Sequence, residues 1–233
     1  MDEVLRRILM NQKDINKVYS HTDLTNLKKT AENEDIKTLC RSAKLLNTKS
    51  VCVAPHYVAL AKEELKDELP LVCTVIGFPN GYSTTATKVF ETENAILNGA
   101  DEIDMVININ MLKNNELDAL TNEIKQLAKI CHGRTNKNGD RVTLKVIVET
   151  CLLNAQEIIT MCDICIEAGA DYIKTSTGFD SAGAQFEDIK MMKTCIGDRP
   201  LKIKASGGIR SLEKALSLMN VGADRIGASS LNS

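Results

Sequence analysis

The sequence predicts a single-domain (β/α)₈ barrel over residues 1–233, with a short N-terminal helix and little or no final helix. The first observation is a repeated junction in which an apolar-periodic helix ends at a glycine and a strand follows Gly-Ala-Asp. It occurs as NGADEIDMVI, AGADYIKTS and VGADRIGAS, at residues 98–107, 168–176 and 221–229. The second is the alternation of eight short β-branched runs with helical periodicity. An open doubly wound sheet is the alternative, which is weakened because no glycine-rich dinucleotide fingerprint follows the first strands.

The elements can be placed in order along the chain. Strands are expected at residues 18–21, 50–55, 71–79, 103–109, 141–150, 171–175 and 200–208, with the eighth inside 221–229. Helices are expected at 35–46, 56–65, 84–97, 117–131, 155–168, 186–195 and 211–219, after an amphipathic N-terminal helix over 1–14. Residues 132–140, HGRTNKNGD, read as a surface loop.

Composition limits the partners and the compartment. The net charge is -2, which does not favour nucleic acid or an anionic membrane, so we expect a small-molecule partner. No apolar run approaches membrane-spanning length. The eight cysteines are scattered singly, as in reduced cytoplasmic proteins. The Cys162-x-x-Cys165 spacing lies inside a predicted helix without a second pair, so we expect neither a metal nor another cofactor.

Ionisable residues lie within or directly after several predicted strands, where barrel enzymes hold their active sites. They are Asp104 in strand four, Lys145 and Glu149 in strand five, Lys174 in strand six, and Lys202 and Lys204 in strand seven. Taken singly, each fits an ion-paired barrel interior or, for Lys174, a solvated strand end. Together they favour acid–base or covalent chemistry.

Lys174 and Lys204 belong to adjacent strands, about 4.8 Å apart, so their side chains can approach each other. Two ammonium groups so placed disfavour each other's charge, and one of the two is expected to lose its proton more readily. An uncharged lysine can attack a carbonyl and form a Schiff base. Asp104 could then carry a proton between the carbinolamine and the enamine carbon. Thr175, directly after Lys174, adds a hydroxyl suited to a polar substrate.

Two glycine-rich loops flank the last strand, at residues 206–210 and 227–230. Loops seven and eight of such barrels commonly bind phosphate through backbone N–H groups, hydroxyls and a helix N-terminus. Ser211 is the expected N-cap of the helix that follows.

Several blocks resemble the class I deoxyribose-phosphate aldolases. They are TVIGFPNGYSTTATKVFE at 74–91, NGADEIDMVININ at 98–110, LKVIVETCLL at 144–153, DYIKTSTGF at 171–179 and KASGGIRSLEKAL at 204–216. The resemblance implies a metal-free, dimeric Schiff-base barrel that reversibly cleaves 2-deoxyribose 5-phosphate into glyceraldehyde 3-phosphate and acetaldehyde. It implies that Lys174 is the Schiff-base lysine, Asp104 the proton-transfer acid and Lys204 the perturbing lysine.

The same resemblance assigns the substrate-binding positions. The phosphate would contact Gly178, Gly207, Gly208, Ser229 and Ser230, while Cys52 would lie near the aldehyde pocket. From their places in strand five and directly after Lys174, Lys145 and Thr175 are also expected to bind substrate.

The chain departs from the family pattern at two places. Ser20-His21-Thr22 stands where the family has Asp-His-Thr, so a hydroxyl is expected in place of a carboxylate near the substrate, with Asp23 as a possible substitute. The sequence also ends directly after loop eight. Two alternatives are another phosphosugar enzyme, such as an isomerase with purely electrostatic lysines, and a catalytically silent phosphate-binding barrel.

Overall fold

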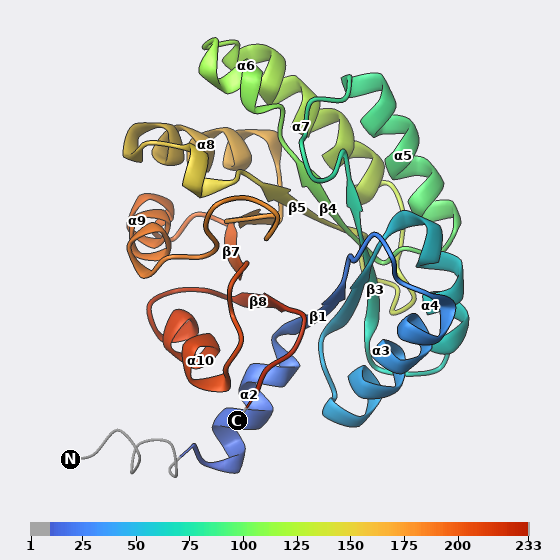
Figure 1. Ribbon diagram of the computed structural model, residues 1–233. Helices are drawn as coiled ribbons and strands as arrows, with labels where there is room; N and C mark the ends of the chain where they lie inside the picture. Colours follow the sequence, from blue (N-terminus) through green and yellow to red (C-terminus); the bar gives the residue numbers. More distant parts are fainter. Residues whose placement is uncertain (1–9, 233) are drawn as a thin grey trace, which may run out of the picture.

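The computed structural model describes residues 10–232, and they form a closed barrel of parallel strands (Figure 1). The strands are β1 (Thr22–Asn26), β2 (Ser50–Val53), β3 (Leu71–Ile76), β4 (Glu102–Val106), β5 (Thr143–Ile147), β6 (Tyr172–Lys174), β7 (Lys202–Ser206) and β8 (Arg225–Ala228). Each pairs with the next, and β8 pairs with β1 with Asp23 opposite Gly227. The predicted barrel is therefore confirmed, and it closes although residues 229–232 form no helix.

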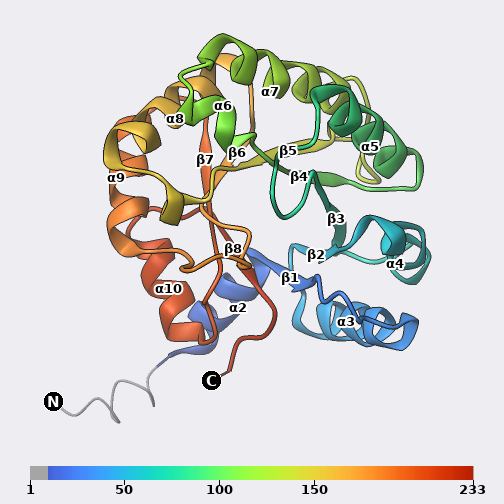
Figure 2. The same cartoon turned by 45° about the horizontal axis from the view of Figure 1, so that its top comes forward.

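Helices surround the barrel, as Figures 1 and 2 show. They are α2 (Gln12–Ser20), α3 (Asn33–Leu46), α4 (Val58–Glu64), α5 (Thr85–Leu97), α6 (Ile109–Lys113), α7 (Leu117–His132), α8 (Ala155–Ala168), α9 (Phe186–Ile196) and α10 (Leu212–Asn220), with the 3₁₀ turns η1 (Pro55–Tyr57) and η2 (Thr150–Leu152). The seven helices expected between residues 35 and 219 are confirmed to within a few residues. The short α6 was not expected. Ser211 caps α10, because its side chain accepts the backbone N–H of Lys214.

The prediction of a first strand at residues 18–21 is wrong. This stretch belongs to α2 and to the turn after it, and β1 begins at Thr22. Asn11 starts α2 by accepting the backbone N–H of Asp14 at 2.9 Å, and the buried Val18 then lies on its inner face. Packing of that face outweighs the β propensity of a valine and a tyrosine. Of the helix expected over residues 1–14, residues 1–9 lie outside the described part of the chain.

Predicted strands three and five end earlier than expected. After β3, Gly77 takes a positive φ of 61°, which turns the chain out of the sheet. After β5, Glu149 takes a left-handed conformation with φ of 56° and leads into η2. Both turns lie at the carboxyl ends of the strands, the end of the barrel that carries the site described below.

The repeated Gly-Ala-Asp junction forms the same clamp three times. The aspartate carboxylate accepts the backbone N–H of a residue on the preceding strand, while the aspartate N–H donates to the carbonyl of that same residue. The pairs are Asp101 with Val72, Asp171 with Leu144 and Asp224 with Ile203, with all six distances between 2.7 and 3.0 Å. Each junction thereby fixes the height of one strand against its neighbour.

The hydrophobic core lies between the sheet and the helices, whereas the barrel interior is largely polar. Six of the eight cysteines are buried, and none forms a disulfide. Among the residues described, the structure contains no helix with the length and apolar character needed to cross a membrane.

Replacing Asp224 with alanine should destabilise the barrel by about 1.5–3 kcal/mol, because a hydrogen bond to a charged acceptor is lost and the Ile203 N–H is left buried. Urea unfolding followed by circular dichroism measures this free energy. Asp224→Asn keeps an acceptor oxygen and should lose less unfolding free energy. Equal losses of unfolding free energy in the two variants would contradict the proposed hydrogen bond between Asp224 and Ile203.

Candidate active site

Seven ionisable residues have their side chains inside the barrel, and each residue as a whole is at most 4% exposed. They are Asp23, Glu102, Asp104, Lys145, Lys174, Lys204 and Arg225. They come from β1, β4, β5, β6, β7 and β8. Charges so fully removed from water are stable only when paired and hydrogen-bonded, and these residues form one connected network.

Asp104 is the centre of this network. Its Oδ2 contacts Nζ of Lys174 at 2.8 Å and Nζ of Lys204 at 2.6 Å, while its Oδ1 contacts Nζ of Lys145 at 2.8 Å. Lys174 and Lys204 are also direct register partners on β6 and β7. The predicted approach of these two lysines, with Asp104 between them, is therefore present in the structure.

The electrostatic surroundings set the charges of these groups. Burial would raise the pKa of Asp104, but Lys145, Lys174 and Lys204 outweigh it and hold that pKa well below its usual value. Burial would lower the pKa of Lys204, but Asp104 and Asp23 outweigh it and raise that pKa. Asp104 is therefore a carboxylate and Lys204 an ammonium at neutral pH.

Asp23 and Glu102 are the other two interior carboxylates. Asp23 contacts Lys204 at 2.5 Å and Arg225 at 2.6 Å, and Glu102 contacts Lys145 at 2.6 Å and Arg225 at 3.3 Å. Burial would raise the pKa of Asp23, but Arg225, Lys204 and Lys145 outweigh it and lower that pKa. Both carboxylates therefore serve to hold cations inside the barrel.

The interpretation of Ser20 as the substitute for a family carboxylate is wrong. Ser20 is exposed at the end of α2, where its hydroxyl donates to the carbonyl of Lys17 at 3.0 Å. It lies before β1, at the amino-terminal end of the barrel. Asp23, on the strand itself, supplies the interior carboxylate. The error arose because the first strand was placed too early.

A cleft of about 550 Å³ opens above Lys174, between the carboxyl ends of β1, β6, β7 and β8. Five of the predicted substrate-binding residues line it: Gly178, Gly207, Gly208, Ser229 and Ser230. Thr25, Lys28, Thr177 and Arg210 line it as well. Lys174 is the interior lysine that reaches this cleft, and its side chain is 5% exposed.

Several glycines form part of the wall of this cleft. Gly178, Gly207 and Gly208 have φ of 84°, 83° and 68°, a region that favours glycine. A Cβ on Gly183 would lie 2.1 Å from the carbonyl oxygen of Gly207. The loops that follow β6 and β7 therefore touch backbone to backbone. Their glycines have no side chains to cover the backbone groups at the cleft.

The other three predicted substrate-binding residues, Cys52, Lys145 and Thr175, lie beneath the cleft and do not line it. Cys52 packs with Cys73 and Val75 in a small apolar cluster, and Lys145 is paired with Asp104 and Glu102 as described above. The hydroxyl of Thr175 donates to the carbonyl of Ser206 at 3.2 Å and accepts its N–H at 3.1 Å. Thr175 thereby ties β6 to β7.

Glu149 supports the loop after β6. Its carboxylate accepts both the backbone N–H and the hydroxyl of Thr177, the residue before Gly178. Burial raises the pKa of Glu149, and the two hydrogen bonds from Thr177 oppose that rise. Glu149 therefore helps to shape the cleft wall.

Neither of the two cysteine groupings favours a metal ion. Cys162 and Cys165 are buried in the hydrophobic core on α8. Sulfur atoms of Cys52 and Cys73 lie within 4.8 Å of a carboxylate oxygen of Asp104, but three ammonium groups already contact that carboxylate. A cation there would face strong repulsion.

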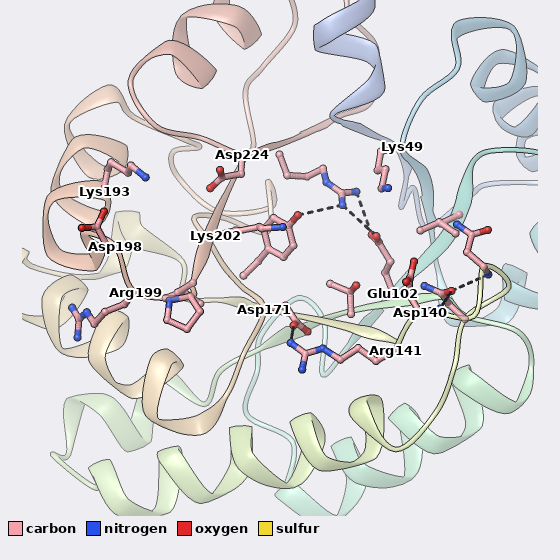
Figure 3. A pocket seen from close by; sticks show the side chains of 18 of the residues that line it. Lys49, Glu102, Asp140, Arg141, Asp171, Lys193, Asp198, Arg199, Lys202 and Asp224 are labelled. Atoms are coloured by element: carbon pink, nitrogen blue, oxygen red, sulfur yellow. Dashed lines mark hydrogen bonds and ion pairs between the residues drawn. The ribbon is translucent and has the colours of Figure 1, made fainter.

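A second hollow, of about 700 Å³, lies at the opposite end of the barrel (Figure 3). Glu102 and Lys202, the first residues of β4 and β7, line it together with Asp171, which directly precedes β6. Lys202, one of the ionisable strand residues singled out in the sequence, has its Nζ 5.7 Å from the ring centre of Tyr172 at this mouth. Lys174 and Asp104 are absent from the lining of this hollow, whereas Lys174 lines the smaller cleft at the other end.

Comparison with known proteins assigns the family. A family model described as DeoC/LacD family aldolase matches residues 17–232. The chain belongs to the DeoC/LacD aldolases. Deoxyribose-phosphate aldolase of Clostridioides difficile (strain 630) is 50% identical over 209 residues, which cover 90% of this chain and 91% of the relative. The protein of that name from Metamycoplasma hominis is 48% identical, with 91% and 92% covered. The tetrameric deoxyribose phosphate aldolase structure from Aeropyrum pernix has a TM-score of 0.84 at 28% identity, covering 98% and 93%.

Sequence reasoning missed two interior residues of this aldolase, Glu102 and Arg225, and named a third, Asp23, only as an alternative. Glu102 lies two residues before Asp104 on β4, and strand alternation could have placed both on the inner face. Arg225 lies two residues before Gly227 on β8, which gives the same signal. Asp23 was considered but passed over, because β1 was placed too early.

Replacing Gly183 with alanine should raise the KM of this aldolase for deoxyribose 5-phosphate by on the order of tenfold, because the new Cβ displaces the Gly207 loop. Steady-state kinetics measures KM, and reductive trapping of acetaldehyde, which carries no phosphate, should change little. Gly139→Ala is the control for a change away from the cleft: nothing lies within 4 Å of a Cβ added there, and its φ of 85° adds backbone strain that Gly183 lacks. Similar KM values in both variants would refute this role of the loop contact.

Proposed function

We propose that this chain is a deoxyribose-phosphate aldolase that cleaves 2-deoxyribose 5-phosphate into glyceraldehyde 3-phosphate and acetaldehyde through an imine on Lys174. The observation that carries this proposal is the contact of one carboxylate oxygen of Asp104 with both Lys174, at the floor of the cleft, and Lys204. A nucleophilic amine and a proton carrier are thereby within hydrogen-bonding distance of each other.

The first step joins enzyme and sugar. The uncharged Nζ of Lys174 attacks the C1 aldehyde of the open-chain sugar and forms a carbinolamine. Protonation of its hydroxyl releases water and leaves an iminium ion. Because Asp104 is ionised in the free enzyme, it acts first as a proton acceptor, and Lys204 is the adjacent donor.

The second step breaks the bond between C2 and C3. A base removes the proton of the C3 hydroxyl, the electron pair of the broken bond moves into the iminium ion, and glyceraldehyde 3-phosphate leaves. The remaining enamine takes a proton at C2, and water releases acetaldehyde and free Lys174. Asp104 and Lys204 together can supply these protons, since Asp104 contacts the Lys174 nitrogen and Lys204 contacts the same carboxylate oxygen of Asp104.

The phosphate would occupy the glycine-lined part of the cleft. Gly178, Gly207 and Gly208 line the cleft, as do Ser229 and Ser230. The side chains of Lys28 and Arg210 add positive charge at its rim. This arrangement would hold the substrate by its phosphate and leave the aldehyde at Lys174.

We also propose a homodimeric, cytoplasmic enzyme. Phe90 and Leu97 lie two turns apart on α5 and are 66% and 81% exposed, as an apolar contact surface would require. Eight free cysteines agree with a reducing compartment.

Borohydride added with acetaldehyde or deoxyribose 5-phosphate should leave a reduced adduct on Lys174 and abolish activity. Peptide mass spectrometry locates the adduct, and Lys174→Met should remove both adduct and cleavage while leaving the fold intact. Lys202→Met is the matched control. An adduct found mainly on Lys145 or Lys204 would overturn the assignment, and cleavage without any adduct would favour purely electrostatic lysines.

Replacing Lys204 with methionine should move the acid limb of imine formation to higher pH. A lysine in water loses its proton at about pH 10.4, so attack at neutral pH needs neighbouring positive charge. Without the Lys204 ammonium, imine formation should fall steeply at pH 7 and recover partly by about pH 9. The measurement is the rate of borohydride trapping against pH. If the pH midpoint of trapping does not change, Lys204 does not keep Lys174 uncharged, and its role would be proton transfer alone.

A further inference from the structure

The charges inside the barrel do not cancel when Lys174 is protonated. Three carboxylates lie there, from Asp23, Glu102 and Asp104, and four basic groups, from Lys145, Lys174, Lys204 and Arg225. With Lys174 uncharged, the three remaining cations match the three carboxylates. With Lys174 protonated, the interior carries one positive charge in excess, which is unfavourable in a site removed from water.

Arg225 is the cation farthest along this network from Lys174. A chain of contacts joins them: Arg225 to Asp23 at 2.6 Å, Asp23 to Lys204 at 2.5 Å, Lys204 to Asp104 at 2.6 Å and Asp104 to Lys174 at 2.8 Å. Arg225 starts β8 near the opposite mouth, where it also contacts Glu102, which Figure 3 labels at that mouth. It does not line the substrate cleft.

An arginine at this position is a permanent charge. Its guanidinium does not lose its proton in proteins, whereas a buried lysine can. Cζ of Arg225 lies 5.4 Å from the ring centre of Tyr172, and its side chain is 5% exposed, so the charge is held in place and little screened by water. Asp23 and Glu102 are thereby neutralised from the far end of the barrel.

We infer that Arg225 is a positioning residue for the aldol reaction, which keeps Lys174 uncharged by neutralising Asp23 and Glu102. Without Arg225, the three carboxylates would need Lys174 as their third cation, and the nucleophile would be held as an ammonium ion. This inference rests on the proposed role of Lys174 as the imine-forming lysine.

Other titratable groups near Lys174 do not replace Arg225 in this balance. Those facing it or its cleft, besides the interior network, are Cys52, Cys73, Glu149, Tyr172, Asp180, Lys28 and Arg210. Burial raises the pKa of the Cys73 thiol, so that group stays uncharged. The hydrogen bond with Cys73 lowers the pKa of the Cys52 thiol, and a thiolate there would add negative charge, which cannot take the place of the Arg225 cation. Glu149 lies above β5 and is held by Thr177, while Asp180, Lys28 and Arg210 are on the solvent side, where water screens their charges.

The simpler explanation is that Arg225 only compensates two buried carboxylates for stability. Both explanations predict that Arg225→Met destabilises the fold, because an uncompensated buried charge is costly. They differ in the pH profile. A purely structural role leaves the midpoint of imine formation in the folded fraction unchanged, whereas the charge balance requires it to move.

The test measures the pH midpoint of borohydride trapping of acetaldehyde on the Lys174 peptide. Arg225→Met should raise the midpoint by about one pH unit, and Glu102→Gln should lower it by a similar amount, as expected for the loss of one nearby charge of either sign. The double variant removes one charge of each sign and should return close to the native midpoint. Arg225→Lys should restore most of the native profile.

Lys202→Met is the control, since Lys202 is an exposed cation at the same mouth outside the ion-pair network. Its midpoint should match that of the native protein. Circular dichroism at each pH confirms folding. Should Arg225→Met not fold, Glu102→Gln and the double variant carry the test, with a lowered and a native midpoint respectively. Unmoved midpoints in the folded variants overturn the inference, whereas a native protein without an adduct on Lys174 overturns the proposed function instead.

Discussion

A carboxylate shared by three ammonium groups is the interaction on which this barrel depends. Asp104 contacts Lys145, Lys174 and Lys204 within 2.8 Å, in an interior that excludes water. Such an arrangement is weak evidence for stability, because desolvation opposes most of the Coulomb attraction, while the loss of one partner costs about 3–5 kcal/mol. The network agrees with the proposed function, since it keeps Asp104, the proposed proton carrier, ionised beside the nitrogen of the proposed nucleophile Lys174.

The parallel barrel makes this arrangement possible because register decides which side chains meet. Lys174 lies opposite Lys204 and Asp104 lies opposite Lys145, whereas Lys145 lies opposite Tyr172, two residues before Lys174. Two adjacent pairs on neighbouring strands are thereby brought within contact of Asp104. The clamps at Asp101, Asp171 and Asp224 fix the strand heights that maintain this register. The cleft lies at the other end of the same strands, where glycines let two loops approach closely. The strand clamps and the cleft therefore lie at opposite ends of the barrel, the separation of stability from function that is typical of such barrels.

The features that depend on local sequence patterns could be predicted from the sequence. Repeated Gly-Ala-Asp junctions and alternating runs predicted the barrel, and the adjacency of strands six and seven predicted the Lys174 and Lys204 pair. Prediction failed where the outcome depended on distant packing. Residues 18–21 have strand-like composition but belong to α2 and its turn. Because the first strand was predicted too early, Ser20 was considered ahead of Asp23 for the position inside the barrel. Thr175 looked like a substrate ligand, yet its hydroxyl is used by Ser206 on the next strand. The pairing of each strand with its neighbours in the barrel cannot be deduced from residues 18–21 or from the residues around Thr175 alone.

The pairing of two lysines, taken alone, does not account for a reactive amine. The positive charge of Lys204 is opposed by Asp23 and Asp104, both in direct contact with it, so its repulsion of Lys174 is largely cancelled at short range. A net electrostatic effect on the protonation of Lys174 appears only when the charges of all the interior groups are added together. Arg225 and Lys145 satisfy carboxylates that would otherwise stabilise a protonated Lys174. The chemistry at the carboxyl end of the barrel is then governed by the charge of the entire interior, including a guanidinium near the opposite mouth.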